Sequence, residues 1–326
     1  MESYLAVTID TECDKGPEWR VRQPIGYRSV LEGAPQRLQP LFNRFGAKPT
    51  YLLSPEMIEH DGCVETLKKL TGAFELGTHL HGEFIEPDRP PMNQVTNTND
   101  MQRQYPAEVE RAKLENLTKL FELRFGYKPT SFRAGRFGIG NNSLKFLDDL
   151  GYLVDSSVTP YAIHDELSFW GCPTTPYRPS ESDPRLKGSL RILEAPVTIH
   201  SPFLSGFPDG WLLGQGPNAW WFRAARKILG KEYVRPIWLR PSFRDFASMK
   251  RVIDAHLAAN RNKSRVLLVM MFHSVEVIPA ASPYAQTESD VNEFMSRLEQ
   301  TLDYCQRMGT KFIGLGEAAG LDWQRS

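Results

Sequence analysis

Short apolar runs rich in β-branched and aromatic residues recur along the chain, and each is bounded by glycine, proline or polar residues. Runs of this length and composition are typical of β-strands. We therefore predict strands at 4–9, 49–53, 73–78, 130–134, 152–156, 190–194, 266–272 and 311–315.

Longer stretches between these runs carry apolar residues at the three- and four-residue spacing of an amphipathic helix. This spacing predicts helices at 34–45, 107–125, 141–150 and 287–308. Glycine, which commonly ends a helix, follows the predicted helices at Gly46, Gly126, Gly151 and Gly309.

The alternation of strands and helices predicts parallel strands joined by crossover helices. The number of such units favours a closed α/β barrel of seven or eight parallel strands, which we expect to span 1–326 as one domain. An open doubly wound sheet is the alternative. Residues 10–16, however, lack the glycine-rich phosphate turn that follows the first strand of such a sheet.

The alternation breaks at 157–240, where proline, glycine and tryptophan are frequent. Long irregular segments in a compact domain are usually either functional loops or disordered. Because the aromatic content argues against disorder, we expect an ordered, aromatic-rich insertion over one end of the barrel.

Composition adds only broad limits. The formal net charge is zero, so nothing in it supports a nucleic-acid partner. The longest apolar run, 266–272, is too short to span a bilayer, and the N-terminus lacks the basic segment of a signal peptide. We therefore expect a cytoplasmic protein whose four cysteines are free thiols.

Titratable or cationic residues end five of the predicted strands. These residues are Asp10 and Glu12, then His79, His81 and Glu83, then Arg133, Asp155 and His273. In a parallel barrel the carboxyl ends of all strands face one mouth, where the active site lies. We therefore expect these side chains to meet.

Two pairs among them have the spacing of neighbours on one side of a strand. Asp10 and Glu12 are two residues apart, and so are His79 and His81. Two imidazoles and one carboxylate form a donor set used by catalytic zinc and non-haem iron. The alternative is that they are polar loop residues, but their combination with His273 favours a site.

Five segments, in order along the chain, resemble the motifs of the polysaccharide deacetylases, carbohydrate esterase family 4. They are T-I-D-T-E, L-G-T-H-L-H-G-E, F-R-A-G-R-F-G, Y-L-V-D-S-S and M-M-F-H-S. The resemblance covers about 1–156 and 264–316. It implies an irregular (β/α) barrel that removes N- or O-acetyl groups from sugars with the help of one divalent metal ion, expected to be zinc.

The same resemblance implies catalytic roles for four residues. Asp10 would be the general base, and Arg133 would orient it. His273 would be the general acid, and Asp155 would hold it.

Two departures from the family pattern bear on the metal ligands. Thr11 stands where a second adjacent aspartate is usual, which leaves Glu12 as the acidic ligand. The usual His-x-x-x-His spacing would place Glu83 in the second position, so Glu83 is the rival of His81. We favour His79 and His81 because of the strand geometry and because neutral imidazole is the commoner ligand.

The expected function is removal of an acetyl group, most readily N-acetyl, from a sugar or glycan intermediate such as one in surface polysaccharide biosynthesis. Trp19 and Trp211 offer stacking faces for a sugar ring, and Arg136 is a further candidate for substrate contact. Hydrolysis of a non-sugar amide or cyclic imide is an alternative in the same fold. A catalytically inactive barrel that binds a glycan or a partner protein is another.

Overall fold

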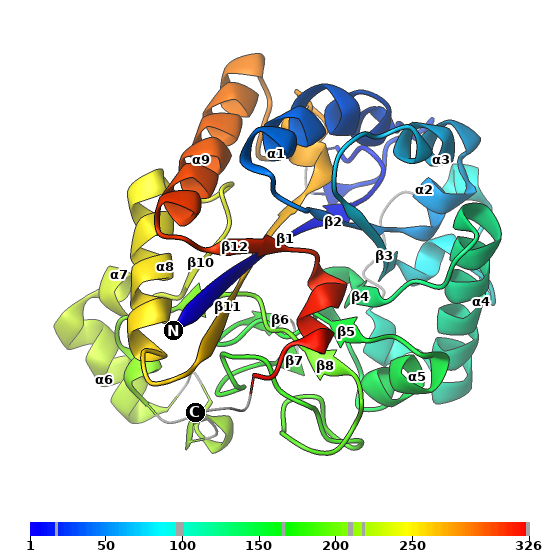
Figure 1. Ribbon diagram of the computed structural model, residues 1–326. Coiled ribbons are helices and arrows are strands. Elements are labelled where there is room, and N and C mark those ends of the chain that lie inside the picture. Colours follow the sequence, from blue (N-terminus) through cyan, green and yellow to red (C-terminus); the bar gives the residue numbers. More distant parts are fainter. Residues whose placement is uncertain (17–18, 96–100, 165–166, 208–210, 217–218, 324–326) are drawn as a thin grey trace.

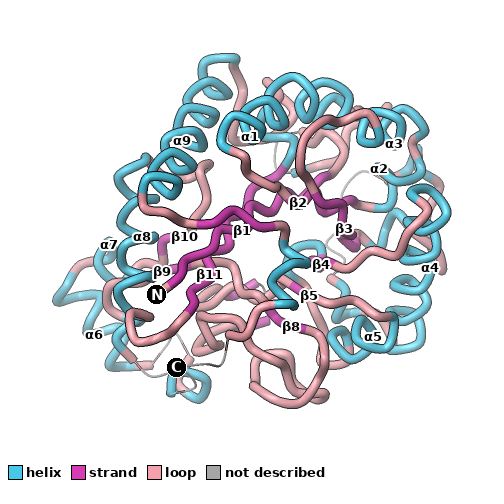
Figure 2. The backbone as a smooth tube through the Cα atoms, viewed as in Figure 1, coloured by secondary structure: helices cyan, strands magenta, loops and turns pink. Residues whose placement is uncertain are grey.

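A curved sheet of parallel strands forms the centre of the computed structural model, and helices cover its outer side (Figures 1 and 2). The structure describes residues 1–16, 19–95, 101–164, 167–207, 211–216 and 219–323. The order along the sheet is β11 (Arg265–His273), β1 (Glu2–Thr11), β2 (Thr50–Leu53), β3 (Glu75–Leu80), β4 (Ser131–Ala134), β5 (Val154–Asp155) and β8 (Leu193–Glu194). An eighth strand, β12 (Lys311–Ile313), pairs with β1.

The helices lie mostly in the connections between successive strands. They are α1 (Gln39–Phe45), α2 (Pro55–Glu59), α3 (Asp61–Lys68), α4 (Ala107–Phe125), α5 (Ser143–Leu150), α6 (Trp220–Leu229), α7 (Lys231–Val234), α8 (Phe246–Ala259) and α9 (Glu288–Arg307). A π-helical segment, Ser29–Leu38, leads directly into α1. None of the described helices is long and apolar enough to cross a membrane.

All eight predicted strands and all four predicted helices are confirmed, with ends that differ by a few residues. The irregular (β/α) barrel of parallel strands is confirmed as well. The prediction missed the shorter helices α2, α3, α6 and α7. It also missed α8, although the buried residues Met249, Val252, Ile253 and Leu257 of α8 have helical spacing.

The segment 157–240 contains short strands and helices rather than a regular repeat. Two small antiparallel pairs form here, β6 (Ile163–His164) with β7 (Leu167–Ser168) and β9 (Ile199–His200) with β10 (Ile237–Trp238). The barrel strand β8 also lies within this segment, so the insertion contributes to the barrel itself. Beyond β8, the backbone N–H of Thr198 donates to the carbonyl of Val269 in β11 at 3.0 Å, which continues the barrel wall irregularly.

The alternation of side chains along β1 explains why acids end a strand that looks built for a core. Leu5, Val7 and Ile9 belong to the core between the sheet and the helices. Tyr4 and Ala6 belong to a second core with residues of β5, β8 and β11, and this core fills the barrel interior. Even-numbered residues of β1 therefore point inward, and Asp10 continues that row at the carboxyl end.

Strand register brings the predicted residues together. In the pairing of β1 with β11, Asp10 stands opposite His273. In the pairing of β3 with β4, His79 stands opposite Arg133. Since all these strands are parallel, their carboxyl ends deliver the side chains to one mouth.

Candidate active site

A cavity of about 290 Å³ lies at the carboxyl ends of the barrel strands. It is lined by Asp10, Glu12, Lys15, Trp19, His81, Arg136, Phe137, His273 and Tyr284. Six of these nine residues are among those that the sequence predicts for catalysis, metal binding or substrate contact. His79 and Arg133 are also buried, and both contact residues that line the cavity.

Three buried side chains form a compact donor set at this cavity. Glu12 Oε1 lies 3.2 Å from His79 Nε2 and 3.2 Å from His81 Nε2. One ligand atom from each of the three residues lies within 4.8 Å of the others. This is the two-histidine, one-carboxylate set that catalytic zinc and non-haem iron use, so the residues present fit a divalent metal ion.

The far side of each imidazole is also engaged. His79 Nδ1 lies 2.9 Å from the carbonyl oxygen of Arg133. Because a carbonyl can only accept, Nδ1 carries a proton, so in the neutral ring Nε2 is the nitrogen left to bind a metal. His81 Nδ1 lies 3.2 Å from Glu83 Oε1, which orients this ring in the same way.

Glu83 contacts the ring nitrogen of His81 that faces away from Glu12. Its Oε1 accepts from Arg136 Nη2 at 3.0 Å, as well as contacting His81 Nδ1. The geometry therefore favours His81 over Glu83 as the donor beside His79 and Glu12. Glu83 lies behind His81, where carboxylates often support metal-binding histidines.

The charges around this donor set favour a cation. Burial disfavours the imidazolium form of His81, but the carboxylates of Glu12 and Glu83 outweigh burial and raise its pKa to about 9. Burial likewise opposes ionisation of Glu12, yet His81 and Lys15 hold the pKa of Glu12 well below its usual range. Glu12 is therefore an anion at neutral pH, as a carboxylate that binds a metal must be.

The sequence prediction missed a buried lysine, Lys15, that forms an ion pair with Oε2 of Glu12. Lys15 Nζ lies 3.1 Å from Glu12 Oε2, and both side chains are almost wholly buried. Its ammonium group also lies 5.6 Å from the centre of the Phe84 ring. Lys15 thus leaves Glu12 Oε1 as the oxygen that faces the two imidazoles. The signal was the three-residue spacing from Glu12, which is weak in a non-helical segment.

Asp10 and Arg133 form a fully buried ion pair across the barrel. Arg133 Nη1 donates to Asp10 Oδ1 at 2.6 Å. Burial raises the pKa of Asp10, but the charges of Arg133, His79 and His273 more than compensate, so its pKa lies below the ordinary value. An ionised, oriented carboxylate is what a general base requires.

His273 faces both acids of the first strand. Its Nε2 lies 3.9 Å from Asp10 Oδ2 and 3.8 Å from Glu12 Oε1. Its Nδ1 lies 3.1 Å from Glu276 Oε1. Burial opposes ionisation of Glu276, but Arg240, whose Nη2 is 2.7 Å away, holds the pKa of Glu276 at about 2.

This arrangement corrects the expectation that Asp155 holds His273. The carboxylate of Asp155 accepts from the backbone N–H of Ser157 at 3.0 Å and from its hydroxyl at 2.7 Å. It also pairs with Glu194, which stands directly opposite on β8. Burial and the charge of Asp155 raise the pKa of Glu194 well above its usual range. Asp155 thus contributes to the barrel wall, and Glu276 takes the position next to His273.

Backbone strain is concentrated at this cavity. Trp19, Arg136 and Phe137 line it with φ values of 60°, 53° and 55°, which residues other than glycine rarely adopt. Gly135 precedes Arg136 and Phe137 in the loop after β4. A Cβ at Gly135 would lie 2.5 Å from the carbonyl oxygen of Leu80 and 3.2 Å from the His81 ring. The loop therefore approaches the donor set closely and turns Arg136 and Phe137 into the cavity.

An aromatic wall borders the cavity on the side of His273. The Trp19 ring lies 4.7 Å from the His273 ring, and Trp19 Nε1 donates to the Tyr284 hydroxyl at 3.1 Å. Trp211, the other tryptophan predicted to contact substrate, is not among the residues that line the cavity. Its ring stacks on Phe207 at 4.7 Å in an aromatic cluster of the insertion.

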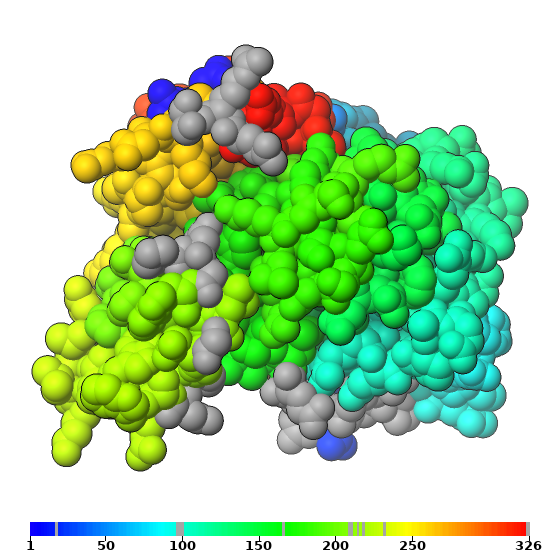
Figure 3. All heavy atoms as spheres, turned by 90° about the horizontal axis from the view of Figure 1, so that it is seen from below, coloured from blue at the N-terminus to red at the C-terminus, as the bar shows by residue number. Residues whose placement is uncertain are grey.

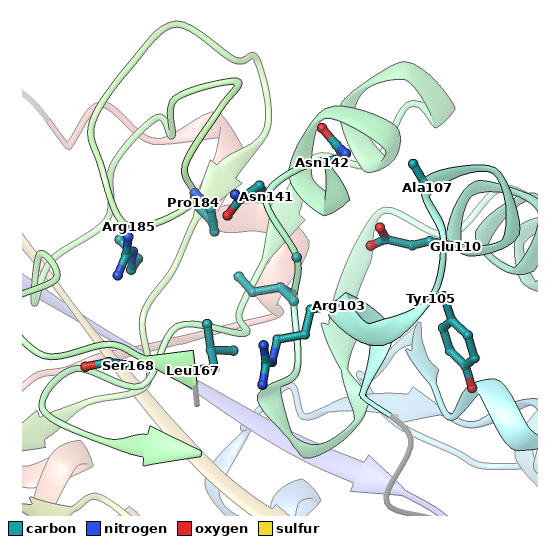
Figure 4. Close-up of a pocket in the computed structure, with 12 residues that line it drawn as sticks. Arg103, Tyr105, Ala107, Glu110, Asn141, Asn142, Leu167, Ser168, Pro184 and Arg185 are labelled. Atoms are coloured by element: carbon teal, nitrogen blue, oxygen red, sulfur yellow. The ribbon is translucent and has the colours of Figure 1, made fainter. Parts of the chain in front are cut away.

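A second cavity, of about 370 Å³, lies between the start of α4 and the loop before α5 (Figure 4). Two of its charged side chains, Glu110 and Arg185, are engaged by neighbouring residues outside the lining. Glu110 accepts from Gln102 at 2.8 Å and from the Ser143 hydroxyl, and Arg185 pairs with Asp183. The metal-type donor set found in the described residues lies at the first cavity, so the first cavity is the candidate active site.

Solved structures of other proteins share the fold of this barrel. A protein from Parabacteroides distasonis described as a glycoside hydrolase/deacetylase matches with a TM-score of 0.64 at 12% identity, over 98% of this chain and 70% of that one. A protein from Mycobacterium smegmatis described as a polysaccharide deacetylase matches with a TM-score of 0.57 at 16% identity, over 98% and 89%. The fold is that of the polysaccharide deacetylases.

The polysaccharide deacetylase fold is not tied to one reaction. A GH57-type branching enzyme from Pyrococcus horikoshii also matches, with a TM-score of 0.53 at 11% identity, over all of this chain and 71% of that one. No family model matches the sequence, and no curated protein matches it. The chemistry must therefore be argued from the site.

Lys15 provides a direct test of the charge balance in this deacetylase-like barrel. Both Lys15 and a bound cation neutralise Glu12, so each should matter more when the other is absent. We expect Lys15→Met to lower the melting temperature of metal-free protein strongly, because breaking a buried ion pair costs about 3–5 kcal/mol. Added zinc should then raise the melting temperature of the variant more than that of the wild type.

The comparison is made by thermal unfolding in a chelator and in excess zinc. Lys48→Met is the control, because it breaks a more exposed ion pair with Glu317 and should leave the zinc-induced rise unchanged. An equal rise in the wild type and in Lys15→Met would show that Lys15 and the metal do not share Glu12.

Proposed function

We propose that this protein is a metal-dependent hydrolase that removes an acetyl group, N-acetyl most readily, from a sugar or glycan intermediate. The strongest support is that three groups of side chains, each suited to one part of this reaction, lie at the same cavity. A two-histidine, one-carboxylate donor set, an arginine-bound carboxylate and a carboxylate-bound histidine all meet there.

Glu12, His79 and His81 would hold the metal, for which zinc is the expected ion. When bound, a divalent ion of this kind acts as a Lewis acid toward water and the acetyl carbonyl. Three contacts hold these donor side chains in place. Lys15 pairs with Glu12, the Arg133 carbonyl bonds to Nδ1 of His79, and Glu83 contacts Nδ1 of His81.

Asp10 would act as the general base. Arg133 takes Oδ1, so Oδ2 is the oxygen directed toward His273 and the cavity. The ion pair keeps the carboxylate charged, and Oδ2 can accept a proton from the water that attacks the acetyl carbon.

His273 would act as the general acid. His273 Nδ1 lies 3.1 Å from Glu276 Oε1 and 3.0 Å from Arg240 Nη2, and these contacts keep Nε2 directed into the cavity. The Nε2 proton can then pass to the leaving amine or alkoxide as the tetrahedral intermediate breaks down. Asp10 and His273 lie on opposite strands of one pair, so one acetyl group can reach both.

The cavity size suits one sugar residue with the remainder of a glycan outside. About 290 Å³ is at the small end of the ~300–1,000 Å³ typical of ligand sites. Trp19 offers an apolar face beside His273, and Arg136 brings a cationic group to the lining of the same cavity. These two residues are our candidates for substrate contact.

Asp10→Asn tests the reaction. The amide keeps the shape but cannot accept the proton, so acetate release by the zinc-loaded protein should fall by at least about 10²-fold. The assay measures acetate from a panel of N-acetylated amino sugars and O-acetylated sugars, with circular dichroism to confirm folding. Wild-type activity in the folded variant, or no acetate release from any panel member by the wild type, would contradict the proposal.

Glu276 and Asp155 can be separated by matched amide substitutions. Because Glu276 contacts Nδ1 of His273, Glu276→Gln should lower kcat by about 10–10²-fold, through a poorer general acid. Asp155→Asn should leave kcat close to that of the wild type, because Asp155 contacts Ser157 and Glu194 instead. Steady-state kinetics on the best substrate decides the point. A large loss in Asp155→Asn with little in Glu276→Gln would reverse the assignment.

A further inference from the structure

Exposed apolar side chains are concentrated around α6. Among the described residues, five of the fifteen large hydrophobic side chains that are exposed lie between 211 and 233. These are Trp211, Trp220, Ile228, Leu229 and Tyr233. Figure 3 shows the yellow-green part of the chain, to which α6 belongs, projecting at one corner of the molecule.

The inner side of α6 accounts for its attachment. Phe222 is buried, and its ring lies 4.9 Å from the Trp170 ring. Trp221 packs beside Phe207 at 5.6 Å, and its Nε1 donates to Gln215 at 3.1 Å. These contacts fix which side of the helix faces the protein and which faces outward.

The outer side combines cations with large apolar groups. Trp220 and Ile228 are 81% and 79% exposed, which is unusual for side chains of their size. Arg223, Arg226 and Lys227 are exposed beside them. At about 100° per residue, Trp220, Arg223 and Lys227 lie on one face, with Arg226 and Ile228 at its two margins. We call these five residues the α6 face.

The charge of the α6 face decides what can cover it. α6 contains three basic residues and no acidic residue, although the whole chain has zero net charge. A second copy of this chain in a symmetric contact would bring these cations together, which is unfavourable. The occupant must therefore be anionic where the cations lie and able to take up a tryptophan and an isoleucine beside them.

A lipid bilayer with anionic headgroups meets both conditions. Basic side chains bind anionic headgroups, and tryptophan is favoured at the boundary between headgroups and acyl chains. Helices that lie in this boundary pair basic residues with exposed Trp, Phe, Leu or Ile. The part of the chain that holds α6 also projects at one corner of the molecule, as docking on a flat surface requires (Figure 3).

We propose that the α6 face docks this protein reversibly on a membrane surface that carries anionic phospholipids. The docking is peripheral, with Trp220 and Ile228 entering the headgroup boundary. It does not depend on the proposed reaction, since no residue of the α6 face lines the candidate active site.

Vesicle sedimentation tests the proposal. The full-length protein is mixed with vesicles of phosphatidylcholine alone, or of phosphatidylcholine with phosphatidylglycerol. We expect binding to the anionic vesicles that weakens as salt is raised, and little binding to neutral ones. Arg223→Gln/Arg226→Gln/Lys227→Gln should weaken binding by about 10²-fold, at the usual contribution of each basic residue.

A second variant and a control separate the apolar part from a general loss of structure. Trp220→Ser/Ile228→Ser should also weaken binding to anionic vesicles, because the boundary contacts are lost. Leu123→Ser is the matched control, since Leu123 on α4 is also 81% exposed but lies outside the α6 face. It should bind like the wild type.

Three results would overturn the proposal. One is the absence of wild-type binding to anionic vesicles at low salt. Another is equal binding by the wild type and the triple variant. The third is concentration-dependent self-association that the α6 variants abolish, which would make the α6 face a contact between copies. Acetate release plays no part in any of these readouts.

Discussion

The buried Arg133 guanidinium is the constraint on which the candidate site depends. Arg133 reaches from β4 to β1 inside the barrel, and its N–H groups are bonded to Asp10, Thr8 and Ser156. A buried guanidinium without such acceptors would be very costly. The carboxyl ends of β1, β4 and β5 must therefore stay in register. The carbonyl of the same residue fixes the tautomer of His79, so one residue orients both the proposed base and a proposed metal ligand.

Electrostatic balance is the second feature of the site. Four acids, Asp10, Glu12, Glu83 and Glu276, stand close together with low accessibility. Each has a cationic partner, respectively Arg133, Lys15, Arg136 and Arg240. Because these charges are paired locally, the site can remain buried and ionised at neutral pH. The histidines are then left between paired carboxylates, which is where a further cation is favoured.

Much of this could be predicted from the sequence because it depends on periodicity. Strand alternation gave the barrel, and parallel strands carry Asp10, His79, Arg133 and His273 to one mouth. What could not be predicted depends on where the chain goes after a strand ends. The turn after β5 folds Asp155 back onto Ser157, and the turn after β11 brings Glu276 under His273. Lys15 likewise returns to Glu12 through a non-repetitive loop, for which spacing has no rule.

If Glu12, His79 and His81 bind a divalent metal, the metal content of purified protein depends on these three side chains. Elemental analysis after dialysis against zinc would compare the wild type with His79→Ala, His81→Ala and Glu83→Gln. The structure predicts stoichiometric zinc in the wild type, loss of zinc in both histidine variants and retention in Glu83→Gln, which supports His81 without providing a donor. Full zinc content in both histidine variants, or none in the wild type, would contradict the account.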